Sequence, residues 1–182
     1  MLDVGPRVFS QEADTFRYVF GASGTLDRLG ADWEAYHTRQ EFSSTQLTEN
    51  YINMLAVANA FDTELGAGVA VNGVQYRCKD AVARRLGCVP LNMFGPNSIT
   101  TEAADYIRFN QLNRTGSIYQ GYAANLSNIT LFEMPAGAVL AAVGIDKSDL
   151  QGEEKVDALT ASGGSSGNPR LSTSGSYDST DY

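Results

Sequence analysis

The chain has 182 residues, 43% of them hydrophobic and only 19% charged, with a formal net charge of −8. This acidic balance argues against nucleic acid as a partner, since that partner requires a basic groove. The sequence contains no run of about 18 apolar residues and therefore predicts no transmembrane helix. MLDVGPRVF has neither the basic start nor the apolar core of a signal peptide. A membrane β-strand stays open, because it requires only about 9–11 residues of alternating polarity.

Residues 14–48 predict a first hairpin. In TFRYVFGASGTL the even positions from Phe16 to Leu26 are apolar or small, whereas the odd positions are small and mostly polar. This alternation is typical of a strand with two different faces. DRLGA then predicts a turn at Gly30, and DWEAYHTRQEFSSTQLT predicts a second strand with Trp33 and His37 on one face.

Residues 49–115 change character and predict short mixed elements. Helices are expected in NYINMLAVANAFD, in KDAVARRLG before Gly87, and in SITTEAADYIRFN after an N-cap at Ser98 or Thr100. GAGVAVNGVQYR predicts a small hairpin, because Asn-Gly is a favoured two-residue turn.

Residues 116–151 predict a second hairpin around the turn EMPAG, and the Gly/Ser-rich residues 152–182 predict a flexible loop. Short turns would then join the strands at one end, and long segments would join them at the other. We therefore predict an all-β fold with short loop helices: an antiparallel transmembrane β-barrel segment of about four strands in two hairpins, with long extracellular loops.

The segment RCKDAVARRLGCVPLNMFGPNSITTEAADYI resembles a loop of TonB-dependent outer-membrane receptors, and LFEMPAGAVLAAVGID resembles a barrel hairpin of the same family. FGASGTL and DWEAY are similar to another of its hairpins, so that the resemblance spans about residues 16–151. Asp146, Lys147 and Ser148 depart from the family pattern, as do His37 and Arg39 at positions expected to be apolar and outward. The matching loop residues are Cys78, Gly87, Cys88, Val89, Pro90, Leu91, Asn92, Phe94, Gly95, Ser98, Ile99, Thr100, Glu102, Ala103, Asp105 and Tyr106.

The resemblance implies part of a receptor in the bacterial outer membrane that imports a bulky scarce nutrient, such as a siderophore, vitamin or carbohydrate, with energy transmitted by TonB. Its expected partners are outer-membrane lipid, lipopolysaccharide, the nutrient and TonB. The family's plug domain, TonB-binding segment and remaining strands are not recognised here, so we interpret the chain as a fragment of the barrel. No cofactor is expected.

Cys78 and Cys88 have nine residues between them, which is neither the Cys-x-x-Cys spacing of a redox pair nor the paired spacing of a four-ligand metal site. A disulfide that staples an extracellular loop fits the oxidising cell surface. Free thiols and a metal site remain as alternatives.

Two further groups are candidate contact residues. Arg77, Lys79, Arg84 and Arg85 form a basic cluster that could recognise an anionic ligand, or could be a solvated face or a contact for lipopolysaccharide phosphates. The expected lumen-facing residues, which could touch substrate or plug or simply hydrate the wall, are Glu34, Tyr36, Tyr119, Asn125 and Asp146. Tyr18, Trp33, Tyr122 and Phe132 are interpreted as an interfacial aromatic belt, with core aromatics of a soluble sheet as the alternative.

No catalytic group is predicted, because the single His cannot be combined with a Ser and an Asp at any meaningful spacing. A soluble secreted or periplasmic β-rich binding domain is the alternative to the receptor. That domain would bury Phe16, Tyr18, Phe20, Ile118 and Tyr122 against a second layer, whereas a barrel wall would leave them bare.

Overall fold

The computed structural model describes residues 3–167 and 170–182, which form mostly β-structure. The chain divides into two units. Unit 1 comprises Met1–Glu12, Thr45–Asn113 and Lys155–Ser172, and unit 2 comprises Ala13–Ser44, Arg114–Glu154 and Thr173–Tyr182. Each unit is described by itself.

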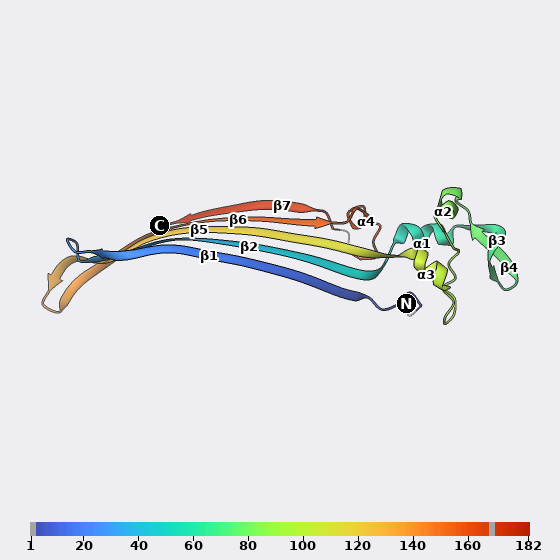
Figure 1. The fold of residues 1–182 in the computed structure, drawn as a ribbon, viewed down its shortest axis with the longest axis horizontal. Helices are drawn as coiled ribbons and strands as arrows, with labels where there is room; N and C mark the ends of the chain where they lie inside the picture. The colour runs from blue at the N-terminus through green and yellow to red at the C-terminus, as the bar shows by residue number, and fades with distance from the viewer. Residues whose placement is uncertain (1–2, 168–169) are drawn as a thin grey trace. The chain divides into compact units, whose positions relative to one another are not determined.

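The main sheet has five strands in the order β1-β2-β5-β6-β7, which lie side by side in Figure 1. β6 and β7 pair in antiparallel register from Asp146↔Asp181 to Glu154↔Thr173. β1 and β7 are the edges, so the sheet of the described residues is open rather than closed. The strands are β1 (Val8–Leu26), β2 (Ala31–Ile52), β5 (Arg108–Met134), β6 (Gly137–Val156) and β7 (Thr173–Asp181).

In unit 2 the sheet is a single layer. No helix belongs to this unit, and most side chains of its part of β1 and β6 are exposed on both faces. Gly30 closes the turn between β1 and β2 with a φ of 57°, a conformation that glycine adopts at no steric cost. The unit therefore has no core of its own between layers.

Unit 1 carries the short elements. These are α1 (Met54–Phe61), β3 (Thr63–Val71), β4 (Val74–Cys78), α2 (Ala81–Arg85), α3 (Thr101–Ile107) and α4 (Ala158–Ala161). Each helix begins after a polar N-cap whose side chain accepts a backbone N–H, namely Asn53, Asp80, Thr100 and Asp157. A small apolar core involves α1 and α3, and Ile107 is fully buried in it. Half of its six residues are alanines; the six are Val4, Ala56, Ala60, Leu91, Ala103 and Ile107.

The segment around α4 is held in unit 1 by polar contacts. Thr160 is completely buried, donates from its hydroxyl to Asp157 at 2.8 Å and accepts from Gln111 Nε2 at 2.9 Å. Met54 N donates to Gly164 O at 2.7 Å, and Ser166 N donates to Ile52 O at 2.9 Å. Backbone pairing and one buried hydroxyl thus fix this segment with little apolar contact.

The structure confirms several expectations and corrects others. The Asn72–Gly73 turn joins β3 to β4 with φ values of 51° and 80°, and the three predicted helices form as α1, α2 and α3, the last capped by Thr100. The sheet of the described residues is open, as predicted for a segment with too few strands to close.

The predicted boundaries were too short. The first hairpin reaches from Val8 to Ile52 rather than 14–48, and the second from Arg108 to Val156 rather than 116–151. The flexible loop predicted for residues 152–182 is wrong over much of its length, because it contains α4 and a fifth strand, β7; its residues 168–169 lie outside the described residues. Gly and Ser weaken a strand only locally, and pairing with β6 overrides their low propensity.

The buried hydroxyl of Thr160 gives a first prediction. Thr160→Val keeps the shape of the side chain but leaves Gln111 Nε2 without its acceptor, and a buried unpaired donor costs about 1–3 kcal/mol. We expect faster amide hydrogen exchange in residues 157–167, measured by mass spectrometry. Thr160→Ser retains the hydroxyl and is the matched control. Equal exchange in Thr160→Val and the unmodified chain would contradict the role given to this side chain.

Candidate functional site

One face of the unit 2 sheet is apolar and bare. Strand alternation places Phe16, Tyr18 and Phe20 of β1 on it, and their rings follow one another at centroid distances of 6.0 and 5.3 Å. Phe16 is 63% exposed, Phe20 69% and Tyr122 47%, although such rings normally bury most of their surface. We call this surface the apolar face; its residues are Phe16, Tyr18, Phe20, Ala22, Leu26, Trp33, Ala35, His37, Tyr122, Ala124, Leu126, Val143 and Ile145.

An aromatic row crosses three strands of the apolar face. The ring of His37 on β2 stacks on Tyr122 of β5 at 4.5 Å and meets Tyr18 of β1 edge-on at 5.9 Å. His37 Nδ1 lies 3.1 Å from Gly121 O, which holds the imidazole flat against its neighbours. His37 therefore belongs to this row, at a position that the sequence pattern expects to be apolar.

The four residues interpreted as an aromatic belt do not all lie together. Tyr18 and Tyr122 lie in the row, and Trp33 lies over Gly24, where an added Cβ would come within 2.9 Å of the indole Nε1. Phe132 lies further along β5 beyond Asn128, whose φ of 59° interrupts the alternation of the strand. The sequence alone gave no signal for this interruption.

The opposite face of the same sheet is polar. Asn125 Nδ2 donates to Glu34 Oε1 at 2.9 Å, and Asn128 Nδ2 donates to Asp32 Oδ2 at 2.6 Å. The other three predicted lumen-facing residues line one shallow hollow of about 310 Å³, and they are Tyr36, Tyr119 and Asp146. All five candidates thus share one face, which we call the polar face.

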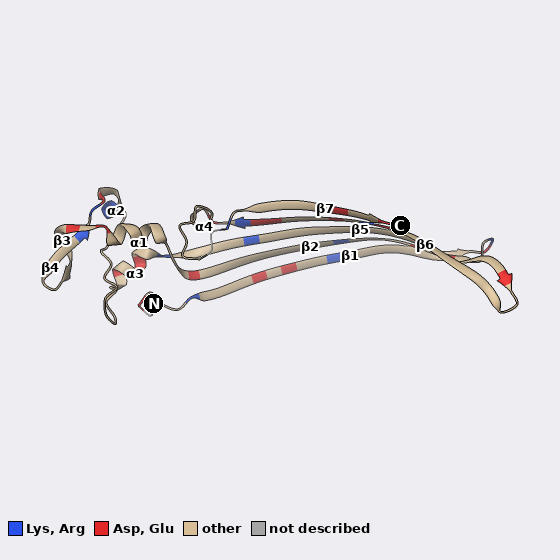
Figure 2. Ribbon diagram, turned by 180° about the vertical axis from the view of Figure 1, so that it is seen from behind, with Lys and Arg blue, Asp and Glu red and all other residues tan. Residues whose placement is uncertain are grey.

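Charge is distributed unevenly along the strands. Between Arg17 and Asp27 in β1, in residues 115–132 of β5 and in residues 137–145 of β6 the sequence contains no Lys, Arg, Asp or Glu. Figure 2 shows these stretches as continuous tan ribbon. In β2 the charged Asp32 and Glu34 point to the polar face, where they accept the amide hydrogen bonds described above.

The apolar face ends at a change from apolar to charged residues. Arg39 follows His37 on the same face of β2 and pairs with Glu41 at 2.5 Å. Lys147 follows Ile145 on β6. Arg39, which departs from the apolar pattern of the sequence, therefore lies beyond the aromatic row with its own counter-charge.

In unit 1, Cys78 and Cys88 form a disulfide with Cα atoms 6.2 Å apart. The bond joins the end of β4 to the residue that follows Gly87, whose φ is 88°. Cys78 is fully buried, and Cys88 packs against the small core. The predicted staple is confirmed, and it closes the α2 segment.

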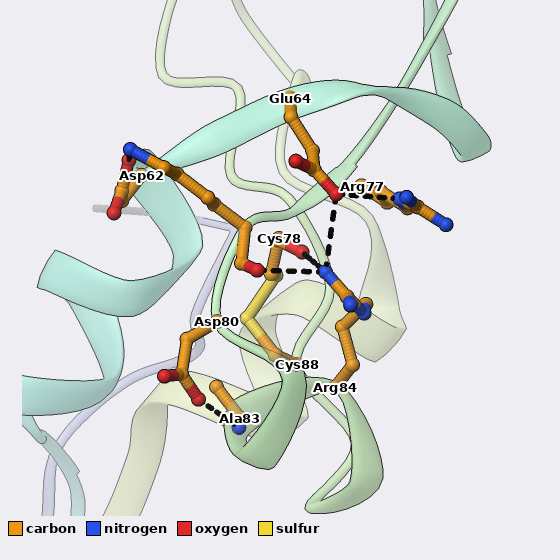
Figure 3. A network of polar contacts seen from close by, with 9 residues as sticks. Asp62, Glu64, Arg77, Cys78, Asp80, Ala83, Arg84 and Cys88 are labelled. Carbon is orange, nitrogen blue, oxygen red and sulfur yellow. Dashed lines mark hydrogen bonds and ion pairs between the residues drawn. A yellow bond between two sulfur atoms is a disulfide. The ribbon is translucent and has the colours of Figure 1, made fainter.

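The four candidate cations of this loop have different surroundings, and Figure 3 shows those of Arg77 and Arg84. Arg84 donates to Cys78 O at 2.6 Å, to Lys79 O at 2.8 Å and to Glu64 at 3.3 Å. Arg77 also pairs with Glu64, at 2.8 Å, and Lys79 lies 4.0 Å from Asp62. Arg85 is exposed, and the described residues offer it no hydrogen bond or ion pair.

Glu102 lies in the first turn of α3. Hydrogen bonds from its own backbone N–H and from the Thr100 hydroxyl lower the pKa of Glu102 below its usual value. A lowered folded-state pKa stabilises the fold above the unfolded pKa, and this contribution is lost as the pH falls through the folded-state pKa. The arrangement caps a helix and contributes no reactive group.

Sequence reasoning missed the counter-charges. Asp62 pairs with Lys79, and Glu64 pairs with Arg77 and with Arg84, which is 20 residues away in the sequence. Glu64 lies opposite Arg77 in the β3–β4 hairpin. The Asn72–Gly73 turn alone does not predict this pair, because its register, continued without interruption, would place Arg77 opposite Gly68. The register shift between Leu65 and Val69 brings Glu64 opposite Arg77 instead.

No family model, curated protein or solved structure was found to match the chain. Within residues 3–167 and 170–182, no helix has the length and hydrophobicity needed to cross a membrane. The same residues contain no group of three or more His, Cys, Asp or Glu side chains placed to hold a metal ion.

Neighbouring arginines give a matched test of the loop. Arg84→Met removes charge-assisted hydrogen bonds to two carbonyls and a carboxylate, and we expect a loss of about 1–2 kcal/mol in unfolding free energy. Arg85→Met should stay within about 0.5 kcal/mol. Denaturant titration of both variants measures the difference, and an equal effect would remove the structural role of Arg84.

Reduction tests the staple. In the chain-entropy model a loop of this size gives about 2–3 kcal/mol, so the Cys78→Ser, Cys88→Ser double variant should open locally. We expect protease cleavage between residues 79 and 100 at least tenfold faster than in the oxidised chain. Thiol titration of the unmodified protein should find no free thiol before reduction and two after it. Unchanged cleavage would mean that the N-cap of Asp80 and the core suffice to hold the loop.

Proposed function

We propose that the chain is part of the β-barrel wall of a TonB-dependent receptor in the bacterial outer membrane. The whole receptor would bind a bulky scarce nutrient and import it with energy transmitted by TonB. The observation that carries this proposal is the bare apolar face of a single-layer sheet, backed by a polar face. The resemblance of the Cys78–Tyr106 loop supplies the family.

The energetics of the apolar face support a lipid environment. Burying one large apolar side chain is worth about 1.5–3 kcal/mol. Six partly bare side chains of the apolar face therefore forgo about 10 kcal/mol; they are Phe16, Phe20, Leu26, Tyr122, Val143 and Ile145. A soluble domain has a total stability of about 5–15 kcal/mol, and it would gain from covering such a face. In a bilayer the acyl chains cover it.

The dimensions of the apolar face also support a membrane strand. From Tyr18 to Leu26 the apolar positions of β1 extend over nine residues, and Phe16 lies outside this stretch near Glu41. A tilted membrane β-strand requires about 9–11 residues, and barrels carry aromatic residues where the hydrocarbon ends. The row of Tyr18, His37 and Tyr122, with Arg39 and Glu41 beyond it, fits that boundary.

The polar face and the loop would supply the contacts of a receptor. Glu34, Tyr36, Tyr119, Asn125 and Asp146 would face the lumen, where they could meet the plug or the nutrient. Among the four loop cations, Arg85 is the best candidate for an anionic ligand. The other three already have carboxylate partners, and a ligand would have to compete with them.

Trp33 is the only tryptophan and therefore reports on its face without interference. The full chain would be refolded into bilayers of phosphatidylcholine, with or without bromine on the acyl chains. Brominated lipid should quench more than half of the Trp33 emission, because contact with bromine is required. Acrylamide, a water-soluble quencher, should have little effect.

A Trp33→Phe, Tyr36→Trp variant is the matched control, because it moves the indole from the apolar face to the polar face of the same strand. Its emission should be quenched by acrylamide and spared by the brominated chains. A chain that stays monodisperse without detergent, melts cooperatively and shows no quenching by brominated lipid would be a soluble β-rich domain, and the receptor proposal would fail.

A further inference from the structure

The apolar face contains a groove of about 550 Å³. Three alanines in adjacent strands, Ala22, Ala35 and Ala124, contribute to its floor. The larger rings of Phe20, His37 and Tyr122 extend further from the sheet than the alanines and form the wall of the groove. The stack of His37 on Tyr122 at 4.5 Å makes that wall continuous.

The wall has little freedom to collapse into the groove. Tyr122 is held by the stack on one side and donates from its hydroxyl to Gln120 at 3.3 Å on the other. The imidazole of His37 is fixed through Nδ1 to Gly121 O. A groove between fixed side chains stays open and accepts a flexible chain without reorganisation, which is the condition for preorganised binding.

The charge at the rim determines what fits. Among the residues that line the groove, Lys147 is the only one with a charged side chain, and none carries a carboxylate. Lys147 is exposed, and it follows Ile145 on the apolar face of β6. An occupant with an apolar chain and an anionic head is therefore complementary to the groove, since the chain meets alanine and aromatic carbon and the head meets the ammonium.

We propose that this groove is a specific lipid site that takes one acyl chain of a lipid whose phosphate headgroup carries a net negative charge, with the phosphate beside Lys147. The inference rests on the proposed function, because it requires the apolar face to meet lipid. It goes further in that one lipid class is preferred over the bulk bilayer. The wall of Phe20, His37 and Tyr122 would lie along the chain, and the alanine floor would admit it closer to the sheet than elsewhere on the apolar face.

Trp33 reports on the groove as well, because it lies two residues from Ala35 on the same face of β2. The full chain would be placed in unbrominated phosphatidylcholine bilayers that contain a few mole per cent of one brominated lipid. The three probes are phosphatidic acid, phosphatidylcholine and diacylglycerol with identical brominated chains. We expect phosphatidic acid to quench Trp33 about threefold more than diacylglycerol at equal mole fraction. A preference of about threefold is what the attraction within a single exposed charge pair provides.

Three variants separate the parts of the site. Ala35→Phe fills the floor and should abolish the preference, and Lys147→Gln should reduce quenching by phosphatidic acid to that by diacylglycerol. Ala141→Phe adds the same bulk to β6 outside the groove and should keep the preference. Far-UV circular dichroism verifies that each variant keeps its β-structure.

The outcomes distinguish the two proposals. If every brominated lipid quenches Trp33 equally in the unmodified chain, or if Ala35→Phe and Lys147→Gln keep the preference for phosphatidic acid, the lipid site is wrong while the membrane location stands. If brominated phosphatidylcholine used as the bulk lipid fails to quench Trp33, the membrane location itself is wrong.

Discussion

The physical constraint behind this structure is a sheet with one layer and two unlike faces. Backbone groups are paired between neighbouring strands, but the side chains of the apolar face have nothing from their own unit packed on them. Hydrogen bonding therefore holds the strands together, and the surroundings must provide what a second layer provides in a sandwich. The aromatic row and the absence of charge in residues 115–132 are consistent with surroundings that are apolar on one side only.

The polar face and the apolar face differ in how their side chains are paired or packed. On the polar face, carboxylates accept from asparagine amides, so that Asp32 and Glu34 carry their charges beside donors of the neighbouring β5. On the apolar face, small residues alternate with rings, and Trp33 covers Gly24. Exchange of the two faces by a one-residue slip would place these carboxylates among the rings, so the register is strongly specified.

Unit 1 has a different source of order. Its apolar core is small, and half of the six core residues are alanine, which contributes little area per residue. Four capped helix starts, a disulfide, the carbonyl contacts of Arg84 and the buried hydroxyl of Thr160 compensate for that small core. An arrangement of this kind fixes the loop geometry without a large hydrophobic core and leaves exposed side chains such as Arg85 available for contacts.

The sequence by itself determined the β-rich class, the two faces of the hairpins, the Asn72–Gly73 turn and three of the helices, because these follow from local periodicity, turn chemistry and capping. Alternation also placed the polar-face residues together before any distance was known. Only the tertiary structure decided the fifth strand, since the Gly and Ser residues of β7 form a strand through pairing with β6. It likewise decided which cations are neutralised and where the alanine-floored groove lies, because both depend on side chains brought together from strands or loops distant in the sequence.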